Sequence, residues 1–179
     1  MIVLSRFIKI ELQKRGGVSC VAELLEKEAP RTSAAVWEAL GQGELGGEAQ
    51  HAKYARNEVY TMVPRFGEEI GQENPTVTPP IPGDVVLFSF PPGGMLDKSF
   101  KVDQGIDHLP GVIDLAIFYG RNNLLINGDV GWVPGNVYAS IVEGLDVMAE
   151  ACHDVWRSGG SVGGERLVYS RITDRPGPH

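Results

Sequence analysis

The chain has 179 residues, of which 42% are hydrophobic and 22% are charged, and it carries a formal net charge of −7. This composition is typical of an ordinary globular protein, and one domain is expected at this length. The acidic balance disfavours nucleic acids and anionic membranes as partners, because both bind clustered Lys and Arg side chains. No apolar run reaches the roughly 18 residues that a membrane-spanning helix needs. We therefore expect a soluble protein.

The N-terminus and the cysteines predict a cytoplasmic location. The N-terminal sequence MIVLSRFIKIEL lacks the basic region, apolar stretch and cleavage site of a signal peptide. Cys20 and Cys152 are the only cysteines. Because no export signal is present, they are expected to be two free, buried thiols rather than a disulfide.

The predicted elements are short strands and two helices. In chain order they are strands at residues 6–13 and 18–25, a helix at 30–40, a loop at 41–47, two strands within 48–63 around a turn near 56–57, strands at 83–88, 113–119 and 136–142, a helix at 145–157 and a strand at 165–172. Alternating or short apolar runs indicate the strands. Apolar residues at helical spacing indicate the helices, and Pro30 and Gly41 suit the two ends of the first helix. On the second helix the packed face is expected to carry Leu145, Met148, Ala149, Cys152 and Trp156.

Eight short strands with two helices indicate a mainly β, closed antiparallel barrel whose open ends are plugged by the helices, although the pattern alone fits a sandwich equally well. Residues 1–173 are expected to form one domain and 174–179 a disordered tail. Residues 89–111 show no sustained period and are longer than most loops. We expect them to be either a lid or the contact surface of a homo-oligomer.

Two segments resemble the cyclophilins. Within residues 23–40, Glu28-Ala29-Pro30-Arg31-Thr32 leads into a helix, and within residues 136–150 a strand ends at Glu143-Gly144 and continues into a helix. Both segments fall at matching places in the order of elements. The resemblance implies an eight-stranded cyclophilin-like barrel capped by two helices.

The middle of the chain is similar to small, uncharacterised bacterial cyclophilin-like proteins. The matching segments are Glu58-Val59-Tyr60 with Pro64, Glu73-Asn74-Pro75 with Gly83-Asp84-Val85, and Phe118-Tyr119-Gly120-Arg121. The prolyl isomerase signature of the cyclophilins, Phe–His–Arg–x–x–Pro–x–Phe–Met–x–Gln–Gly–Gly, is replaced by QHAKYARNEVYTMVPRF at residues 50–66. Arg56 and Met62 offer a guanidinium and an apolar contact outside the frame of that signature. The resemblance therefore implies the barrel without the isomerase residues.

A candidate ligand pocket is predicted on one face of this region. Its residues are Tyr54, Arg56, Glu58, Tyr60, Glu73, Phe118, Arg121 and Asn122. The four between 54 and 60 would share one strand face if the pairing is unbroken, and the two arginines suit carboxylates. Alternatively, Arg56 and Glu58 are solvated partners on the barrel exterior, and the two tyrosines pack as ordinary strand aromatics. Glu73-Asn74-Pro75 and Arg121-Asn122-Asn123 would then be turns.

The remaining reactive side chains give weaker signals. His51 is the candidate general base by location, although a lone histidine is more often a surface or satisfied residue. Cys152 falls on the packed helix face, so a reactive pair with the adjacent His153 is not expected. No cluster has zinc-ligand spacing, and the glycines of residues 158–164 follow a helix instead of preceding one. No metal or cofactor is therefore predicted.

The sequence thus predicts a cyclophilin-like barrel that binds, or binds and transforms, a small anionic or amide-containing metabolite. One alternative is a peptidyl-prolyl isomerase with a rebuilt site. The other is a non-enzymatic structural or oligomeric interaction protein. Whether the protein is an enzyme stays open at this stage.

Overall fold

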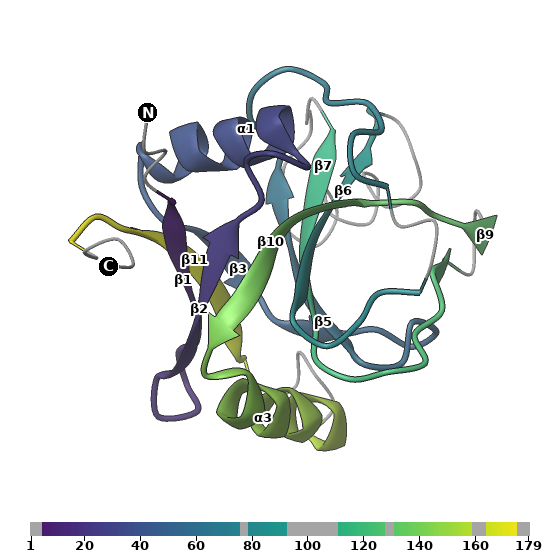
Figure 1. Ribbon diagram of the computed structural model, residues 1–179. Helices are drawn as coiled ribbons and strands as arrows, with labels where there is room; N and C mark the ends of the chain where they lie inside the picture. Colours follow the sequence, from purple (N-terminus) through teal and green to yellow (C-terminus); the bar gives the residue numbers. More distant parts are fainter. Residues whose placement is uncertain (1–4, 76–78, 93–110, 128–130, 159–163, 175–179) are drawn as a thin grey trace.

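The computed structural model describes residues 5–75, 79–92, 111–127, 131–158 and 164–174 (Figure 1). The strands are β1 (Phe7–Leu12), β2 (Val18–Leu24), β3 (Leu45–Glu48), β4 (Gln50–His51), β5 (Glu58–Pro64), β6 (Asp84–Phe90), β7 (Val112–Phe118), β8 (Ile126–Asn127), β9 (Gly131–Trp132), β10 (Asn136–Glu143) and β11 (Arg166–Ile172), and the helices are α1 (Pro30–Leu40) and α3 (Leu145–Arg157).

Nine strands form one antiparallel sheet in the order β3-β11-β1-β2-β10-β6-β7-β5-β4. Its two edge strands, β3 and β4, are consecutive in the chain and are separated by Ala49 alone. A single stretch of chain therefore joins both edges of the sheet. The edges also approach each other at Gly47, where an added Cβ would lie 2.9 Å from Thr61 Oγ1. The sheet is in this way a nearly closed barrel, as the sequence predicts.

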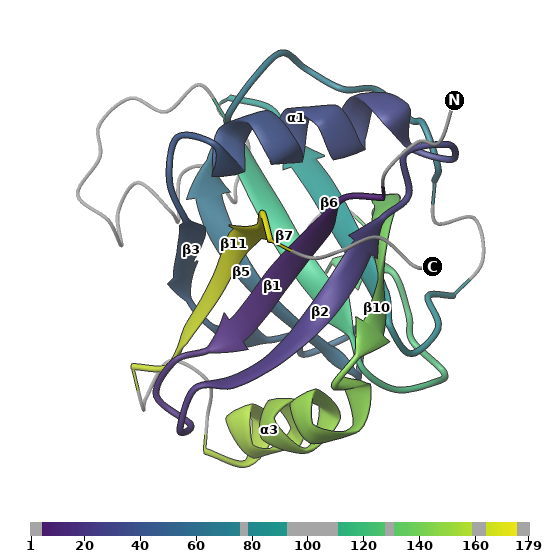
Figure 2. The ribbon, with the colours of Figure 1, turned by 60° about the vertical axis from the view of Figure 1, so that its left-hand side comes forward.

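The two helices lie at opposite ends of the barrel, with α1 next to β10 and β11 and α3 next to β2 and β4 (Figure 2). Pro30 lies in the first turn of α1 and Gly41 follows its last residue, as predicted. On α3 the buried residues are Met148, Ala151, Cys152 and Val155. The prediction that Trp156 belongs to the packed face is wrong, because its side chain is 53% exposed.

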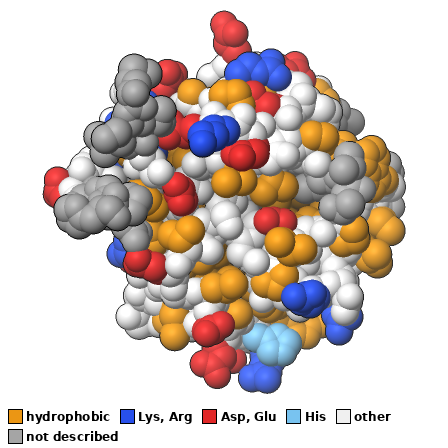
Figure 3. Space-filling view, viewed as in Figure 1, with side chains coloured by type: hydrophobic (Ala, Val, Ile, Leu, Met, Phe, Trp, Pro, Cys, Tyr) orange, Lys and Arg blue, Asp and Glu red, His pale blue; other side chains and the backbone are white. Residues whose placement is uncertain are grey.

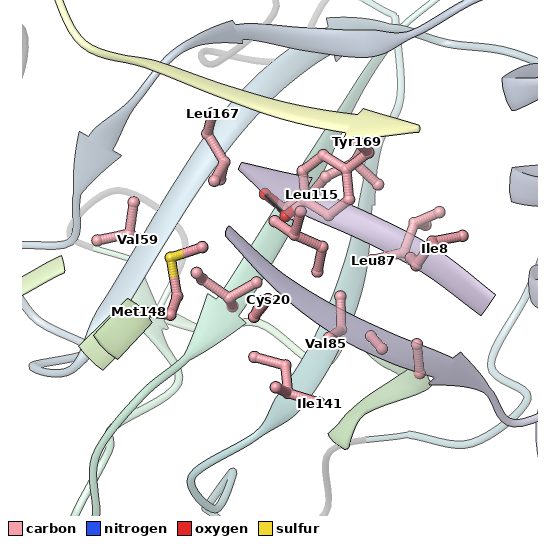
Figure 4. Packing of buried hydrophobic residues seen from close by; sticks show 14 of the residues in the cluster. Ile8, Cys20, Val59, Val85, Leu87, Leu115, Ile141, Met148, Leu167 and Tyr169 are labelled. Atoms are coloured by element: carbon pink, nitrogen blue, oxygen red, sulfur yellow. Dashed lines mark hydrogen bonds between the residues drawn. The ribbon is translucent and has the colours of Figure 1, made fainter. Parts of the chain in front are cut away.

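The barrel interior is filled by side chains from strands on all sides and from both helices. Figure 4 shows Ile8, Leu115 and Tyr169 among the residues that meet in this core. These side chains are buried without charged neighbours in the cluster. Cys20 and Cys152 are both free and buried here, as predicted. This interior is the apolar core that drives folding.

Two parts of the sequence prediction need correction. The expected loop at residues 41–47 contains the start of β3, whose two glycines offer no strand pattern. Gly46 lets the chain approach β11 closely, and Gly47 lets it approach Thr61 of β5. The short hairpin of β8 and β9 was also not predicted, because two-residue strands carry no readable periodicity.

Most of the expected lid or contact surface at residues 89–111 lies outside the described residues, as does nearly all of the expected tail at 174–179. In the part of the chain that the structure describes, no helix is long and apolar enough to cross a membrane.

Candidate functional site

The outward face of β5, β6 and β7 carries a second buried cluster, separate from the barrel interior. Side chains alternate between the two faces of a strand. On β7, Leu115 and Ile117 point into the core, whereas Ala116 and Phe118 belong to the outer cluster. We call this outward surface, with Glu58, Tyr60, Phe88, Asp114, Ala116 and Phe118, the outer-face site.

Two acids lie within this apolar surface. Glu58 lies two residues before Tyr60 on β5, and Asp114 lies two residues before Ala116 on β7. Because alternate residues of a strand point to the same face, both carboxyl groups face outward. Each residue is only 7% exposed. Asp114 Oδ1 is buried and has no hydrogen-bond partner among the described residues. A buried polar atom without a partner costs about 1–3 kcal/mol, so its presence calls for a functional explanation.

The surroundings raise the pKa of both acids and so favour their protonated forms. Burial raises the pKa of Glu58 to about 8. Burial, followed by the nearby charge of Glu58, raises the pKa of Asp114 well above its ordinary value. Strongly perturbed acids of this kind gather at functional sites more often than elsewhere. At neutral pH Glu58 is therefore a carboxylic acid, and the ionised form of Asp114 beside it is disfavoured.

Tyr60 lies between the two acids on β5. Its hydroxyl donates a hydrogen bond of 2.9 Å to Gln50 Oε1 on the neighbouring β4. Burial raises the pKa of Tyr60, and the charges of Asp114 and Glu58 raise it further. The phenol thus stays protonated and fixes one edge of the outer-face site.

Two loops cover part of this surface and are tied to each other. Ala52 and Ala55 of the first loop and Leu125 of the second pack on the outer cluster. The side chain of Asn57 donates to Arg121 O at 2.8 Å, and the backbone N–H of Asn57 donates to Asn123 Oδ1 at 3.1 Å. These bonds hold the loops as a fixed frame around the acids.

The chain also passes directly over β6 at Gly135. A Cβ at this position would lie 2.5 Å from Val86 Cγ1 and 2.7 Å from the Phe88 ring. Only glycine fits such a close approach. Next to this crossing, hydrophobic side chains gather on the part of the surface that carries β9, where Trp132 is 61% exposed (Figure 3).

The structure brings together three of the residues that the sequence proposed for a pocket. Glu58, Tyr60 and Phe118 all lie on the outer-face site. Asp114 was missed, since its strand was interpreted as one buried apolar run. The available signal was the acid itself within VIDLAIF, because a charged residue inside such a run is rarely buried without a partner.

The other proposed residues lie away from the two acids. Tyr54 is 58% exposed, and Arg56 lies in the loop after β4 with a φ of 75°, so the two do not share a strand face with Glu58. Arg121 and Asn122 are exposed in the turn after β7. The alternative interpretation of Arg121 and Asn122 as turn residues agrees with these positions.

Glu73 has a structural role at the start of α1. Its Oε1 accepts from the backbone N–H of Arg31 at 2.9 Å, and its Oε2 accepts from the N–H of Thr32 at 2.8 Å and from the Thr32 hydroxyl at 2.7 Å. The α1 N-terminus has no side-chain cap of its own. Glu73 therefore replaces the usual capping residue.

His51 lies opposite Val59, which points into the barrel, so its ring is on the other face of the sheet from Glu58. Its Nδ1 donates to Ala52 O at 2.9 Å, and its Nε2 accepts from the Tyr119 hydroxyl at 2.5 Å. Burial lowers the pKa of His51. Both ring nitrogens are thus engaged, and the ring does not line the outer-face site. Among the described residues, no group of three His, Cys, Asp or Glu side chains could hold a metal ion.

The barrel, its two end helices and the site on the outward sheet face together define a cyclophilin-like fold. The chain belongs to the family described as "Protein of unknown function (DUF3830)", which matches residues 10–169. A solved structure described as McbB in complex with tryptophan is similar, with a TM-score of 0.58 and 18% sequence identity. The match covers 96% of this chain and 48% of that chain, and at this identity it shows the fold alone. No curated protein matches the chain.

Proposed function

We propose that this protein binds a small molecule at the outer-face site and recognises it through an amine. The observation that carries the proposal is the pair of buried acids, Glu58 and Asp114, of which Asp114 has a carboxyl oxygen without a partner among the described residues. A buried acid of this kind is stabilised by a ligand that supplies an N–H donor or a positive charge.

The position of the arginines favours an amine over the anionic ligand that the sequence predicts. Arg56 and Arg121 are exposed on loops, whereas the buried charges of the outer-face site are acidic. The similar McbB structure holds tryptophan, which carries both an amine and a carboxylate and is therefore compatible with either class of ligand. The anionic ligand remains a prediction, and one experiment separates the two.

The experiment is a thermal-shift panel of amines, carboxylates, amides and amino acids at millimolar concentration. A ligand that binds only the folded state raises the melting temperature. We expect amines to stabilise the wild type and to lose this effect in Asp114→Asn. Stabilisation by carboxylates that disappears in Arg56→Ala or Arg121→Ala, with no response to amines, would contradict the proposal and support the anionic ligand.

A further inference from the structure

The two acids of the outer-face site lie at opposite ends of one strip of the sheet. Glu58 is opposite Phe118 on β7, and Asp114 is opposite Met62 on β5. One outward pair, Tyr60 and Ala116, lies between these two rows. The rows are therefore four residues apart, which is about 13 Å along the strands at about 3.3 Å per residue. The side chains shorten this separation enough for the charge of Glu58 to act on Asp114.

The surface between the acids is apolar. Ala116 is fully buried beneath the outer cluster. The partly exposed members of that cluster are Tyr60, Phe90, Val133 and Val137. A ligand that reached both acids would place its middle against these side chains. Its body must therefore be hydrocarbon or aromatic, because a charged middle would be desolvated there without a partner.

No cation of the described chain neutralises either acid. Neither Glu58 nor Asp114 takes part in an ion pair of the described residues. The guanidinium of Arg65, the residue after β5, is held by Glu69 at 3.6 Å and by Ser89 at 3.1 Å. Two acids without cationic partners at the two ends of an apolar strip leave two places for donors from a ligand.

We propose that the outer-face site takes a two-ended nitrogen ligand, with a protonated amine at one end of an apolar body and a second N–H group at the other. Aliphatic diamines and arylalkylamines with a ring N–H belong to this class. The inference rests on the proposed function and adds that both acids bind the same molecule. It also predicts that the apolar body has an optimal length.

Binding of such a ligand releases protons. In the free site Glu58 is a carboxylic acid at neutral pH, since burial raises its pKa to about 8. An ammonium group pairs with a carboxylate, so the acid proton leaves to the buffer while the ligand keeps its own proton. Affinity for the cation is therefore expected to rise with pH up to about 8 and then to level off.

The other titratable groups around the strip do not account for this pH dependence of ligand affinity. Tyr60 on β5 stays protonated because burial raises its pKa. Asp84 on β6 lies two residues before Val86 and therefore points to the same outward face. Its Oδ2 already accepts a hydrogen bond from the backbone N–H of Ile81 at 2.9 Å. The covering loops add Lys53, Arg56 and Arg121, whose side chains are exposed.

Isothermal titration calorimetry with α,ω-diamines of increasing length tests the inference, with n-alkyl monoamines of the same lengths as controls. We expect a diamine of optimal length to bind about tenfold more tightly than its monoamine, which is the effect of one charged hydrogen bond. Glu58→Gln and Asp114→Asn should each reduce diamine affinity to the monoamine level. The exposed Glu150→Gln serves as the matched control. Titrations in two buffers of different ionisation enthalpy measure the released proton.

The outcomes separate this inference from the proposed function. Monoamines and diamines that bind equally well, with both affinities lost in Asp114→Asn, would overturn the two-ended ligand and leave the amine site standing. No binding by either series would overturn both. Because removal of a buried acid is not expected to unfold the protein, a melting curve of each variant confirms that lost binding is not lost folding.

Discussion

The two faces of strand β7 differ in what they do for the protein. Ile113, Leu115 and Ile117 point into the barrel and belong to its buried hydrophobic core. Asp114 points outward from the same strand into a surface that is equally buried but holds a second acid. The barrel interior buries apolar groups and neutral hydroxyls, of which those of Thr61 and Tyr138 have no hydrogen-bond partner, whereas the outer face buries two carboxyl groups. The interior side chains stabilise the fold, and the proposed ligand site accounts for the two buried acids on the outer face.

The largest expected effect comes from the inner face. Leu115→Ala removes a fully buried side chain from the core and is expected to lower the free energy of unfolding by about 2–5 kcal/mol. Chemical denaturation measures the change. The matched control Val142→Ala, at a position that is 47% exposed, should change stability by less than about 0.5 kcal/mol. Equal losses in the two variants would contradict the assignment of the core.

Replacement of the two acids on the outer face should instead raise the free energy of unfolding. Folding raises the pKa of Glu58 from 4.5 to about 8, so between these values the folded protein binds more protons than the unfolded chain. Stability must then fall as the pH rises from about 4.5 to about 8. The double variant Glu58→Gln with Asp114→Asn removes this loss, and we expect it to be more stable than the wild type by about 1–3 kcal/mol at pH 8.5.

Denaturation curves of the wild type and the double variant at pH 5 and pH 8.5 provide the measurement. The variant's advantage should grow between the two values. A variant that is less stable than the wild type at pH 8.5 would mean that the acids have partners that hold them in the folded state, and the comparison of the two faces would fail.

Glu73 differs from Asp114, because both of its carboxylate oxygens accept hydrogen bonds. Glu73→Gln weakens the hydrogen bonds to Arg31 and Thr32 at the start of α1 and is expected to cost about 1 kcal/mol of stability. The exposed Glu68→Gln is the control. Denaturant midpoints of the two variants give the difference, and a Glu73 variant as stable as the Glu68 variant would refute the capping role.

The smallest expected effect concerns His51. Burial lowers its pKa, the hydrogen bond to Ala52 raises it, and the charge of His153 lowers it. Below the ordinary value of about 6.5 the unfolded chain therefore binds more protons, and stability falls as the pH decreases from there. His51→Gln should flatten this slope between pH 6.5 and pH 5 by up to about 1 kcal/mol. An unchanged slope, measured by thermal melts, would show that the ring is not buried in its neutral form.

The sequence was most informative where local patterns decide the structure. The alternation in β1, Pro30 at the start of α1 and the Glu143-Gly144 turn before α3 depend on neighbouring residues. They predict the limits of the two helices correctly and those of β1 to within one residue at each end. Three residues of the candidate site, Glu58, Tyr60 and Phe118, could be predicted from the alternation of side chains along a strand and from the cyclophilin-like motif.

The rest of the site depends on contacts across the sheet and between loops. Asp114 becomes part of the site only because β7 pairs with β5 in one register, and a register between distant strands cannot be read from either strand alone. Arg56 was assigned to the pocket because residues 54–60 were expected to form one unbroken strand face, and Glu73 because of its carboxylate. Their positions are set by a loop conformation and by a helix end that the sequence patterns do not specify.

The protonation of the two acids tests the central claim most directly. Side-chain carboxyl ¹³C shifts of Glu58 and Asp114, followed by NMR over a pH range with the two single variants for assignment, report each titration separately. We predict that Glu58 titrates near pH 8 and that Asp114 titrates well above its ordinary range, and that an amine ligand lowers both midpoints. Two acids that titrate near pH 4, as exposed carboxylates do, would show that the outer face holds no buried acid pair and would contradict the ligand site.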